Sequence, residues 1–344
     1  MTFDHRPKGR LDAAPLTLPE RPLVSIVIPC LNEERYITAL LDSLSAQDYG
    51  PEGIEVIVAD GGSTDRTRML VRDYPSRFKR LELVDNPKRI TVGGLNAGMR
   101  AATGDCWVII GAHSAVQQDF VRASVDALRR TGAACVGGPI ETIGDGAVGR
   151  AIAAAMSSPF GVGNAKFRYA ETEGEVDTVP FGCYHRAVWE LVGEFDETVD
   201  GADEDSYNAR LIEAGGRIIL VPAIRSSYYP RRSFPALARQ YREYGAAKGT
   251  LFSRGRPLQP RHFVPSAMVT AAPALLLVGL FWKPAMWALR LLAVAYVVGG
   301  VVTARRPAGK AGANPLVAFA AMAIMHVTYG IGFITGALRE RRRE

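Results

Sequence analysis

Two stretches decide the fold: VSIVIPCLNEE at residues 24–34 and VIVADGGSTDRT at residues 56–67. Each begins as a short run of mostly β-branched apolar residues, and each run ends at a proline or at a pair of glycines. Short apolar runs bounded by such residues are typical of strands buried on both faces of a parallel sheet. We therefore predict strands at residues 23–29 and 54–59, with a helix at residues 32–45 between them.

The same alternation continues along the chain. The pattern predicts a helix, a strand, a helix and a strand at residues 67–74, 81–84, 94–102 and 106–110. Such alternation indicates an α/β fold with a doubly wound, Rossmann-like, mostly parallel sheet, which binds ligands at the carboxyl ends of its strands. Residues 141–180 are rich in glycine, alanine and acids and give no clear pattern. Other predicted elements are helices at 119–130 and 203–214, strands at 134–138 and 218–221, and a strand entering a helix at 181–191.

The composition changes near residue 260. The formal net charge of the chain is +6, and nine basic residues with one acid, Glu243, lie between Arg225 and Arg261. This basic run suits anionic lipid headgroups, and a solvated basic surface is the alternative. Three apolar segments follow, each near the ~20 residues that a bilayer-spanning helix needs, at residues 264–282, 285–302 and 315–338.

These observations predict five parts of the chain. They are a mobile N-terminal tail (1–22), the α/β domain (23–225), a basic amphipathic segment (226–262), about three transmembrane or re-entrant helices (263–338) and a basic tail (339–344). The basic amphipathic segment includes a helix at residues 233–244 that is expected to lie on the membrane surface.

The membrane topology is not settled by the charges. A loop at residues 304–313 carries Arg305, Arg306 and Lys310, and the chain ends in RERRRE. Positive loops favour the cytoplasm, so a hairpin of the first two spans satisfies the loop, whereas a full third span places RERRRE outside. The third segment is therefore re-entrant or interfacial, or the number of spans is wrong by one.

The four cysteines are far apart in the sequence, and none forms a C-x-x-C pair. A structural zinc site and a disulfide framework are therefore not expected, and isolated thiols fit a reducing cytosol.

The motifs together resemble one family. The two opening stretches, followed by LNAGMRAATGD, GEFDE and DEDSYNARLIEAGG, resemble the family-2 inverting glycosyltransferases with the GT-A fold over residues 23–250. The sequence is most similar to the succinoglycan-biosynthesis type, partly because AHS stands at residues 112–114 where most members have an acid pair. The resemblance implies a nucleotide-sugar donor and residues around the strand ends that bind it. The residues that we assign to donor binding are Pro29, Asn32, Glu33, Asp60, Gly61, Gly62 and Ala112.

Physical reasoning leaves alternatives at several of these positions. Asn32 and Glu33 can cap the next helix or reach a base or ribose. The family role of Asp60 is to accept the N3–H of a uracil ring, and an Asx-turn is the alternative. Gly61 and Gly62 permit close approach of the backbone to a ligand, and many relatives carry a second acid where Gly61 stands.

The expected metal site departs from the family pattern. Relatives carry Asp-x-Asp, whose last acid holds a divalent cation that bridges the donor phosphates, where this chain has Gly111, Ala112 and His113. A neutral imidazole binds Mn²⁺ through one nitrogen, whereas a carboxylate suits Mg²⁺ better. His113 is therefore a candidate ligand for Mn²⁺ or Mg²⁺, and a direct hydrogen bond from this histidine to a phosphate is the alternative.

The acidic cluster at residues 203–205 carries the catalytic hypothesis. Inverting transfer needs a carboxylate that takes the proton of the attacking hydroxyl. The resemblance assigns this role to Asp205, and Glu204 then orients it or contacts the acceptor. The alternative is an acidic cap at a helix start, where carboxylates are stabilised by the helix dipole.

The sequence thus predicts a membrane-attached inverting glycosyltransferase at the inner face of a bacterial membrane. It is expected to move a sugar from a nucleotide-sugar, most simply a UDP-sugar, to a lipid-linked saccharide. The Gln-x-x-Arg-Trp pattern of processive relatives is imperfect here, since Glu243 and Tyr244 follow Gln240, which favours one sugar per encounter. The alternatives are a polyprenyl-phosphate sugar synthase and, more remotely, a non-catalytic nucleotide-binding membrane protein. Nucleic acid is not an expected partner.

Overall fold

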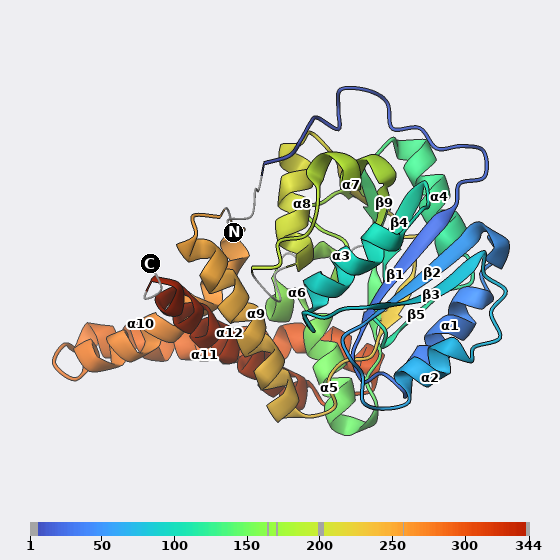
Figure 1. Cartoon of the computed structure of the whole chain (residues 1–344). Helices are drawn as coiled ribbons and strands as arrows, with labels where there is room; N and C mark the ends of the chain where they lie inside the picture. The colour runs from blue at the N-terminus through green and yellow to red at the C-terminus, as the bar shows by residue number, and fades with distance from the viewer. Residues whose placement is uncertain (1–5, 164, 170, 199–202, 257, 342–344) are drawn as a thin grey trace. The chain divides into compact units, whose positions relative to one another are not determined.

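The computed structural model describes residues 6–163, 165–169, 171–198, 203–256 and 258–341, and the chain falls into two compact units (Figure 1). Unit 1 comprises residues 1–141 and 170–228, and unit 2 comprises residues 142–169 and 229–344.

Unit 1 is built on a sheet of eight strands in the order β3-β2-β1-β4-β9-β6-β10-β8. Neighbours pair in parallel from β3 through β4 and between β6 and β10, while β9 is antiparallel to both of its neighbours and β8 to β10. The strands are β1 (Val24–Cys30), β2 (Ile54–Asp60), β3 (Arg80–Asp85), β4 (Cys106–Ile109), β6 (Cys135–Gly137), β8 (Gly174–Glu175), β9 (Cys183–His185) and β10 (Ile218–Leu220). The predicted mixed α/β fold with a mostly parallel sheet is confirmed.

The central strands form where apolar residues run continuously. Every residue of β2 is buried, as is every residue of β1 except Pro29. Their register pairs Cys30 with Asp60, so both strands end at the same level of the sheet. The helices of this unit are α1 (Ile37–Ser45), α2 (Thr67–Arg72), α3 (Thr91–Ala101), α4 (Phe120–Thr131), α7 (Arg186–Val192) and α8 (Asp203–Glu213).

A second sheet has three strands in the order β5-β11-β7. They are β5 (Ser114–Val116), β7 (Ile140–Thr142) and β11 (Ser226–Tyr228). Strands β5 and β11 are antiparallel, and Ser114 pairs with Tyr228. None of the three was predicted from the sequence, because a three-residue strand is too short to show a periodic pattern.

Part of the segment predicted as a mobile tail at residues 1–22 contacts the sheet unit. The backbone N–H of Leu11 donates to the carbonyl of Ala214 at 2.7 Å, and that of Lys8 donates to Leu191 at 2.6 Å. The Leu11 side chain is buried.

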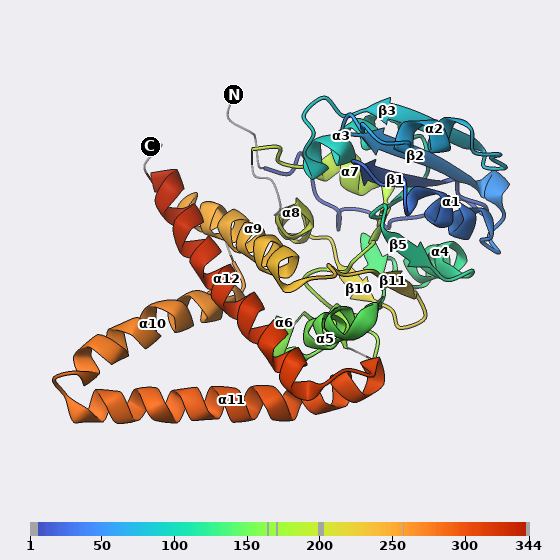
Figure 2. The same cartoon turned by 90° about the horizontal axis from the view of Figure 1, so that it is seen from below.

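Unit 2 is helical, and Figure 2 shows its arrangement from below. Its α-helices are α5 (Gly146–Met156), α6 (Pro159–Val162), α9 (Phe234–Ser253), α10 (Val264–Gly279), α11 (Lys283–Ala311) and α12 (Pro315–Arg341). Three helical stretches, at residues 260–279, 283–311 and 315–341, are long and apolar enough to cross a membrane. The surface helix predicted at 233–244 is part of the longer α9, which packs along α12.

The loop predicted at residues 304–313 is instead mostly helix, because α11 continues to Ala311. Ala304 and Ala308 are fully buried in this last part of the helix, so packing stabilises it. Gly312 ends the helix in a left-handed conformation with φ +61°, and its carbonyl accepts a hydrogen bond from the Arg150 guanidinium at 2.9 Å.

Candidate active site

Two loops at the carboxyl edge of the sheet are joined by hydrogen bonds. The loop after β1 and the loop after β2 exchange contacts through Asn32, whose N–H donates to Ser63 Oγ at 2.8 Å and whose side-chain oxygen accepts from the N–H of Thr64 at 2.9 Å. Asn32 has a positive φ of 56°, which asparagine tolerates better than most residues. It does not cap α1, which begins at Ile37 after the uncapped Tyr36. Asn32, in the loop after β1, therefore holds the loop after β2 in place.

Asp60 ends β2 and is buried. Its carboxylate accepts hydrogen bonds from the N–H groups of Gly62 and Ser63 at 3.0 and 3.1 Å, from the Ser63 hydroxyl at 2.5 Å and from the Arg68 guanidinium at 2.6 Å. Burial by itself would raise the pKa of Asp60, but the bonds from Ser63 and Arg68 outweigh it and hold the pKa below its usual range. The Asx-turn is thus present, and it holds a charged carboxylate at the strand end.

The two glycines after Asp60 differ in whether a side chain could stand at their position. Gly62 has a φ of +82°, which favours glycine, and the Arg89 guanidinium lies 3.0 Å from where a Cβ would stand. At Gly61 a Cβ would meet its nearest neighbours at 3.5 Å, an ordinary contact. A side chain can therefore be accommodated at Gly61 without moving the backbone.

Arg89 is a candidate that sequence reasoning missed. It has a positive φ of 58° in the turn before α3, and its guanidinium lies against Gly62 at the edge where the strands end. No ion pair of Arg89 is found within the described part of the chain. No local pattern predicts this position, because residues other than glycine are uncommon in the left-handed region.

His113 and Glu33, predicted for separate roles, are partners. The Nδ1 of His113 lies 3.1 Å from a carboxylate oxygen of Glu33, and the ring packs edge-on against Tyr228 with 5.4 Å between ring centres. A carboxylate only accepts hydrogen bonds, so Nδ1 carries a hydrogen, and in the neutral form of the ring Nε2 is then the acceptor nitrogen. A carboxylate in this position restricts the orientation of the His113 ring, as carboxylates behind metal-ligating histidines do in other proteins.

The residues next to His113 leave an open polar position. Gly111 has no side chain, and a Cβ there would lie 3.5 Å from Ser114 Oγ and 3.9 Å from the Phe181 ring. The Ser114 hydroxyl is buried without a hydrogen-bond partner among the described residues. Ala112 is buried and supplies only its backbone to this turn.

Manganese or magnesium fits this position only in part. Among the described residues, no group of three or more His, Cys, Asp or Glu side chains could hold a metal ion. His113 Nε2 is one suitable nitrogen ligand and the Ser114 hydroxyl a possible neutral oxygen, so most of the coordination shell would come from the donor phosphates and water. The described residues therefore supply few ligands of their own to a cation at this position.

The acidic cluster begins α8, which is held firmly by its other face. Tyr207 is buried in a stack with Phe195 at 4.0 Å between ring centres, and the Asn208 side chain bonds the Tyr184 hydroxyl and Thr178 at 3.0 Å each. The Arg210 guanidinium donates to the carbonyls of Val192 and Glu194 at 2.9 and 2.5 Å.

Glu204 and Asp205 are both half-buried, and they face different directions. Glu204 shares a helix face with Tyr207, Asn208 and Leu211, which are buried, so it lies on the side of α8 that packs on the rest of the unit. Asp205 shares a helix face with the exposed Ala209 and Ile212. The segment at residues 199–202, just before this helix, lies outside the described residues.

Topology brings the start of α8 to the same sheet edge as Asp60. Strand β10 is parallel to β6, and β6 runs in the same direction as β4 because both are antiparallel to β9. Helix α8 leads into β10 through a short turn and therefore ends at the amino edge of the sheet. Its 11 residues span ~16 Å, so its first turn lies near the carboxyl edge.

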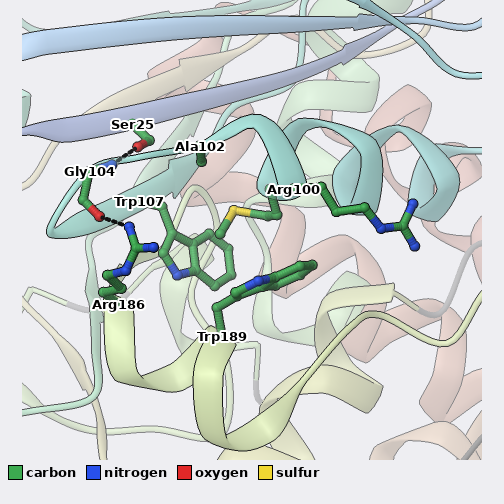
Figure 3. A pocket seen from close by; sticks show the side chains of 8 residues that line it. Ser25, Arg100, Ala102, Gly104, Trp107, Arg186 and Trp189 are labelled. Atoms are coloured by element: carbon green, nitrogen blue, oxygen red, sulfur yellow. Dashed lines mark hydrogen bonds between the residues drawn. The ribbon is translucent and has the colours of Figure 1, made fainter.

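A small cavity of about 100 Å³ lies at the opposite edge (Figure 3). Ser25, Gly104 and Arg186, which line it, stand where β1 and β4 begin and where β9 ends. Ligand sites of this class of sheet lie beyond the carboxyl ends of the strands, and nucleotide pockets are several times larger. This cavity is therefore not the donor site.

Comparisons with known proteins identify the family. The model of glycosyl transferase family 2 matches residues 25–188. Over 325 residues, 92% of this chain and 96% of the relative, the sequence is 32% identical to the succinoglycan biosynthesis protein ExoA of Rhizobium meliloti. The chain belongs to glycosyl transferase family 2. It is a glycosyltransferase of EC class 2.4 that acts on nucleotide-sugars in glycan or polysaccharide biosynthesis.

Two further similarities extend the comparison. Over 240 residues, 67% of this glycosyltransferase and 74% of the relative, the identity is 33% to the dolichyl N-acetyl-α-D-glucosaminyl phosphate 3-β-D-2,3-diacetamido-2,3-dideoxy-β-D-glucuronosyltransferase of Methanococcus voltae. Among solved structures, the mannosyltransferase PcManGT of Pyrobaculum calidifontis, in complex with GDP-Man and Mn²⁺, matches with a TM-score of 0.58 at 20% identity. That match covers 92% of this chain and 91% of the other, and it confirms the predicted GT-A fold.

Proposed function

We propose that this glycosyltransferase transfers one sugar per encounter from a UDP-sugar to a lipid-linked saccharide, with inversion, at the cytoplasmic face of a bacterial plasma membrane. The observation that carries the proposal is the position of Asp60 and Asp205. One ends β2, and the other stands in the first turn of α8 at the same edge of one sheet.

The donor nucleotide is assigned to the loops after β1 and β2. Asp60 accepts the N3–H of the base in exchange for one of its present donors, and the Ser63 hydroxyl can rotate away most easily. Gly62 allows the backbone to approach the nucleotide, while Asn32 and Glu33 keep the adjoining loop in place rather than contacting the base. Arg89, beside Gly62, supplies positive charge to the nucleotide.

The diphosphate is assigned to the turn after β4. His113 Nε2 is the proposed metal ligand, and the buried Ser114 hydroxyl is available to a phosphate oxygen. A divalent cation held there supplies Lewis-acid stabilisation of the departing diphosphate. Glu33 fixes the His113 ring so that Nε2 faces away from it. A direct bond from His113 to a phosphate remains the alternative.

Asp205 is the proposed general base. It takes the proton of the acceptor hydroxyl while that oxygen forms a bond to the anomeric carbon. The bond from that carbon to the phosphate oxygen breaks on the opposite face, and the nucleoside diphosphate leaves with the electron pair. Glu204, on the sheet side of the helix, positions the first turn of α8.

A lipid-linked acceptor is supported by two observations. The name of the Methanococcus voltae relative includes a dolichyl-linked sugar phosphate. Unit 2 carries three helices apolar enough to cross a membrane, which would keep the enzyme where such acceptors are. A polyprenyl phosphate that accepts the first sugar is the second candidate, because a phosphate acceptor needs little base catalysis and favours cations.

The test compares Asp205→Asn with Glu213→Gln, which removes an exposed acid at the other end of the same helix. The proposal expects Asp205→Asn to reduce turnover on a sugar-alcohol acceptor by ~10²-fold or more while the donor Kd stays within about threefold, and the control to keep both. Retained turnover in Asp205→Asn would contradict the role. Transfer to polyprenyl phosphate alone, unaffected by Asp205→Asn, would instead favour the second candidate.

A further inference from the structure

The three apolar helices of unit 2 expose their side chains to very different degrees. From Phe263 to Val302, across α10 and α11, fifteen large hydrophobic side chains are exposed, including Phe281 at 94%. Along the whole of α12 the exposed large hydrophobic side chains are only four: Leu316, Val327, Ile331 and Leu338. Of the most apolar stretch of each helix, 39% is buried in α12, against 0% in α10 and 11% in α11. Two helices thus present apolar surface with no protein partner in the described chain, and the third is largely covered.

The C-terminal half of α12 is covered by α9 through interlocking glycines. A Cβ on Gly245 or Gly249 of α9 would come closer than 3.0 Å to backbone atoms of Tyr329 or Phe333. Two glycines of α12, Gly332 and Gly336, are just as close to α9: a Cβ on either would come closer than 3.0 Å to backbone atoms of Arg242 or Ala246. Each helix carries the small-x-x-x-small spacing that lets two backbones approach closely. The two helices run in parallel here, and Figure 2 shows them side by side.

Helix α9 brings charges beside this half of α12. Arg242, Glu243 and Lys248 lie in the segment that packs there, and just beyond it the Arg254 guanidinium pairs with Glu340 at 2.8 Å. If α12 crossed the bilayer with α9 attached, these charges would enter hydrocarbon, which is costly for each of them. The stretch that α9 covers therefore belongs outside the hydrocarbon.

The rest of α12 is too short to span a bilayer. Residues 315–328 are 14 residues, which rise ~21 Å against a hydrocarbon thickness of ~30 Å. This half is also covered by protein, because α5 and α6 pack on it. His326 in this half bonds the Tyr296 hydroxyl at 2.8 Å and the Gly161 carbonyl at 3.3 Å, which ties α12 to α11 and α6.

We propose that the chain enters the bilayer only as the hairpin of α10 and α11, and that α12 lies with α9 on the side from which the hairpin starts. The occupant of the exposed apolar surface is the hydrocarbon of the membrane. Figure 2 shows α10 and α11 meeting at a tip that projects away from α12. Trp282 and Lys283 form that tip and suit the opposite headgroup layer.

The charges of unit 2 agree with this topology. Its residues include 20 Lys and Arg and four Asp and Glu, whereas unit 1 has 21 and 31. With a single hairpin, every basic residue of unit 2 except Lys283 and Arg290 stays on the starting side, including Arg305, Arg306 and Lys310. The C-terminal basic residues join them, so the conflict between a third span and the charge rule disappears. A side with this excess of basic residues suits anionic lipid headgroups.

The experiment labels single cysteines in the full-length protein in membrane vesicles of known orientation with a membrane-impermeant maleimide. The variants are Lys283→Cys at the tip, Gly309→Cys near the end of α11 and Arg341→Cys at the end of α12. The native cysteines are buried, so unsubstituted protein is the blank, and detergent-solubilised protein gives full labelling.

The proposal expects Gly309→Cys and Arg341→Cys to react from one face and Lys283→Cys from the other. Labelling of Arg341→Cys from the same face as Lys283→Cys would establish a third span and overturn the proposal. Protection of Lys283→Cys from both faces, with labelling restored in detergent, would overturn the crossing of the hairpin.

Discussion

Asn96 on α3 offers the sharpest test of how α8, the helix that carries Asp205, is held in place. Its side chain is fully buried, and its amide nitrogen donates to the Phe195 carbonyl at 3.0 Å and to Glu197 at 2.9 Å. Its amide oxygen accepts from the Phe195 N–H at 2.8 Å. The Phe195 ring in turn stacks on Tyr207 of α8 at 4.0 Å. Asn96 thus connects the nucleotide-binding half of the sheet to the helix that carries Asp205.

The substitution Asn96→Ala leaves two buried backbone groups of Phe195 without partners. Each unsatisfied buried group costs about 1–3 kcal/mol, so the free energy of unfolding should fall by about 2–6 kcal/mol. For a unit of about 200 residues each kcal/mol lowers Tm by about 2–4 °C, which gives a fall of at least about 4 °C. Because Phe195 supports α8, kcat should fall more than the donor affinity.

Thermal unfolding followed by tryptophan fluorescence measures the first effect, since Trp107 packs edge-on against Phe195 at 6.2 Å between ring centres. Donor titration and turnover measure the second. The control is Gln118→Ala, which truncates an exposed amide. A variant whose Tm stays within about 1 °C of the parent, with unchanged kcat, would refute the account of Asn96 as the support of Phe195.

Three further substitutions test other parts of the structure. Arg68→Met removes a charged partner of Asp60 and should lower the free energy of unfolding by about 1–3 kcal/mol at pH 7. Because the pKa of Asp60 is lowered in the folded state, this loss, measured by denaturant titration, should be full above about pH 5 and should shrink as the pH falls below about 4. A loss that does not depend on pH would contradict this account. Glu33→Gln should weaken Mn²⁺ binding in the presence of UDP by about 10-fold or more and change the ¹⁵N shifts of the His113 ring, and unchanged shifts would show that Glu33 does not fix the ring. Gly249→Val should separate α9 from α12 and lower the Tm of the detergent-solubilised enzyme, whereas an unchanged Tm would show that the close glycine packing is dispensable.

The sequence predicts those elements of the fold that depend on a pattern of neighbouring residues in the chain. Strands β1 and β2 are continuous β-branched runs, and their predicted bounds agree with the structure to within one residue. The three-residue strands of the small sheet were missed because no pattern can form over so short a length. The helical end of α11 was predicted as a charged loop, since composition does not reveal that α5 would pack on its alanines.

The candidate site was predictable residue by residue, but its pairings were not. Asp60 and the acidic start of α8 stand out as polar residues at strand and helix ends, where ligand sites are expected. The contact of Glu33 with His113 joins residues that are 80 positions apart in the sequence. The position of Arg89 depends on a left-handed backbone conformation that cannot be predicted from its residue type. Tertiary contacts of Glu33 and Asn32 could therefore not be predicted from the sequence around each residue.

The departure at Gly111 and His113 has a consequence for the order of binding. A pair of carboxylates can concentrate a divalent cation before the donor arrives, because their charges attract it without the phosphates. In the proposed site the His113 imidazole and the Ser114 hydroxyl take the place of that pair, and the Glu33 carboxylate is engaged with His113 Nδ1. The charge that holds a cation must then come from the diphosphate itself. The metal and the nucleotide should bind as one unit, so Mn²⁺ affinity should depend on UDP and UDP affinity on Mn²⁺ by the same factor, as linkage requires.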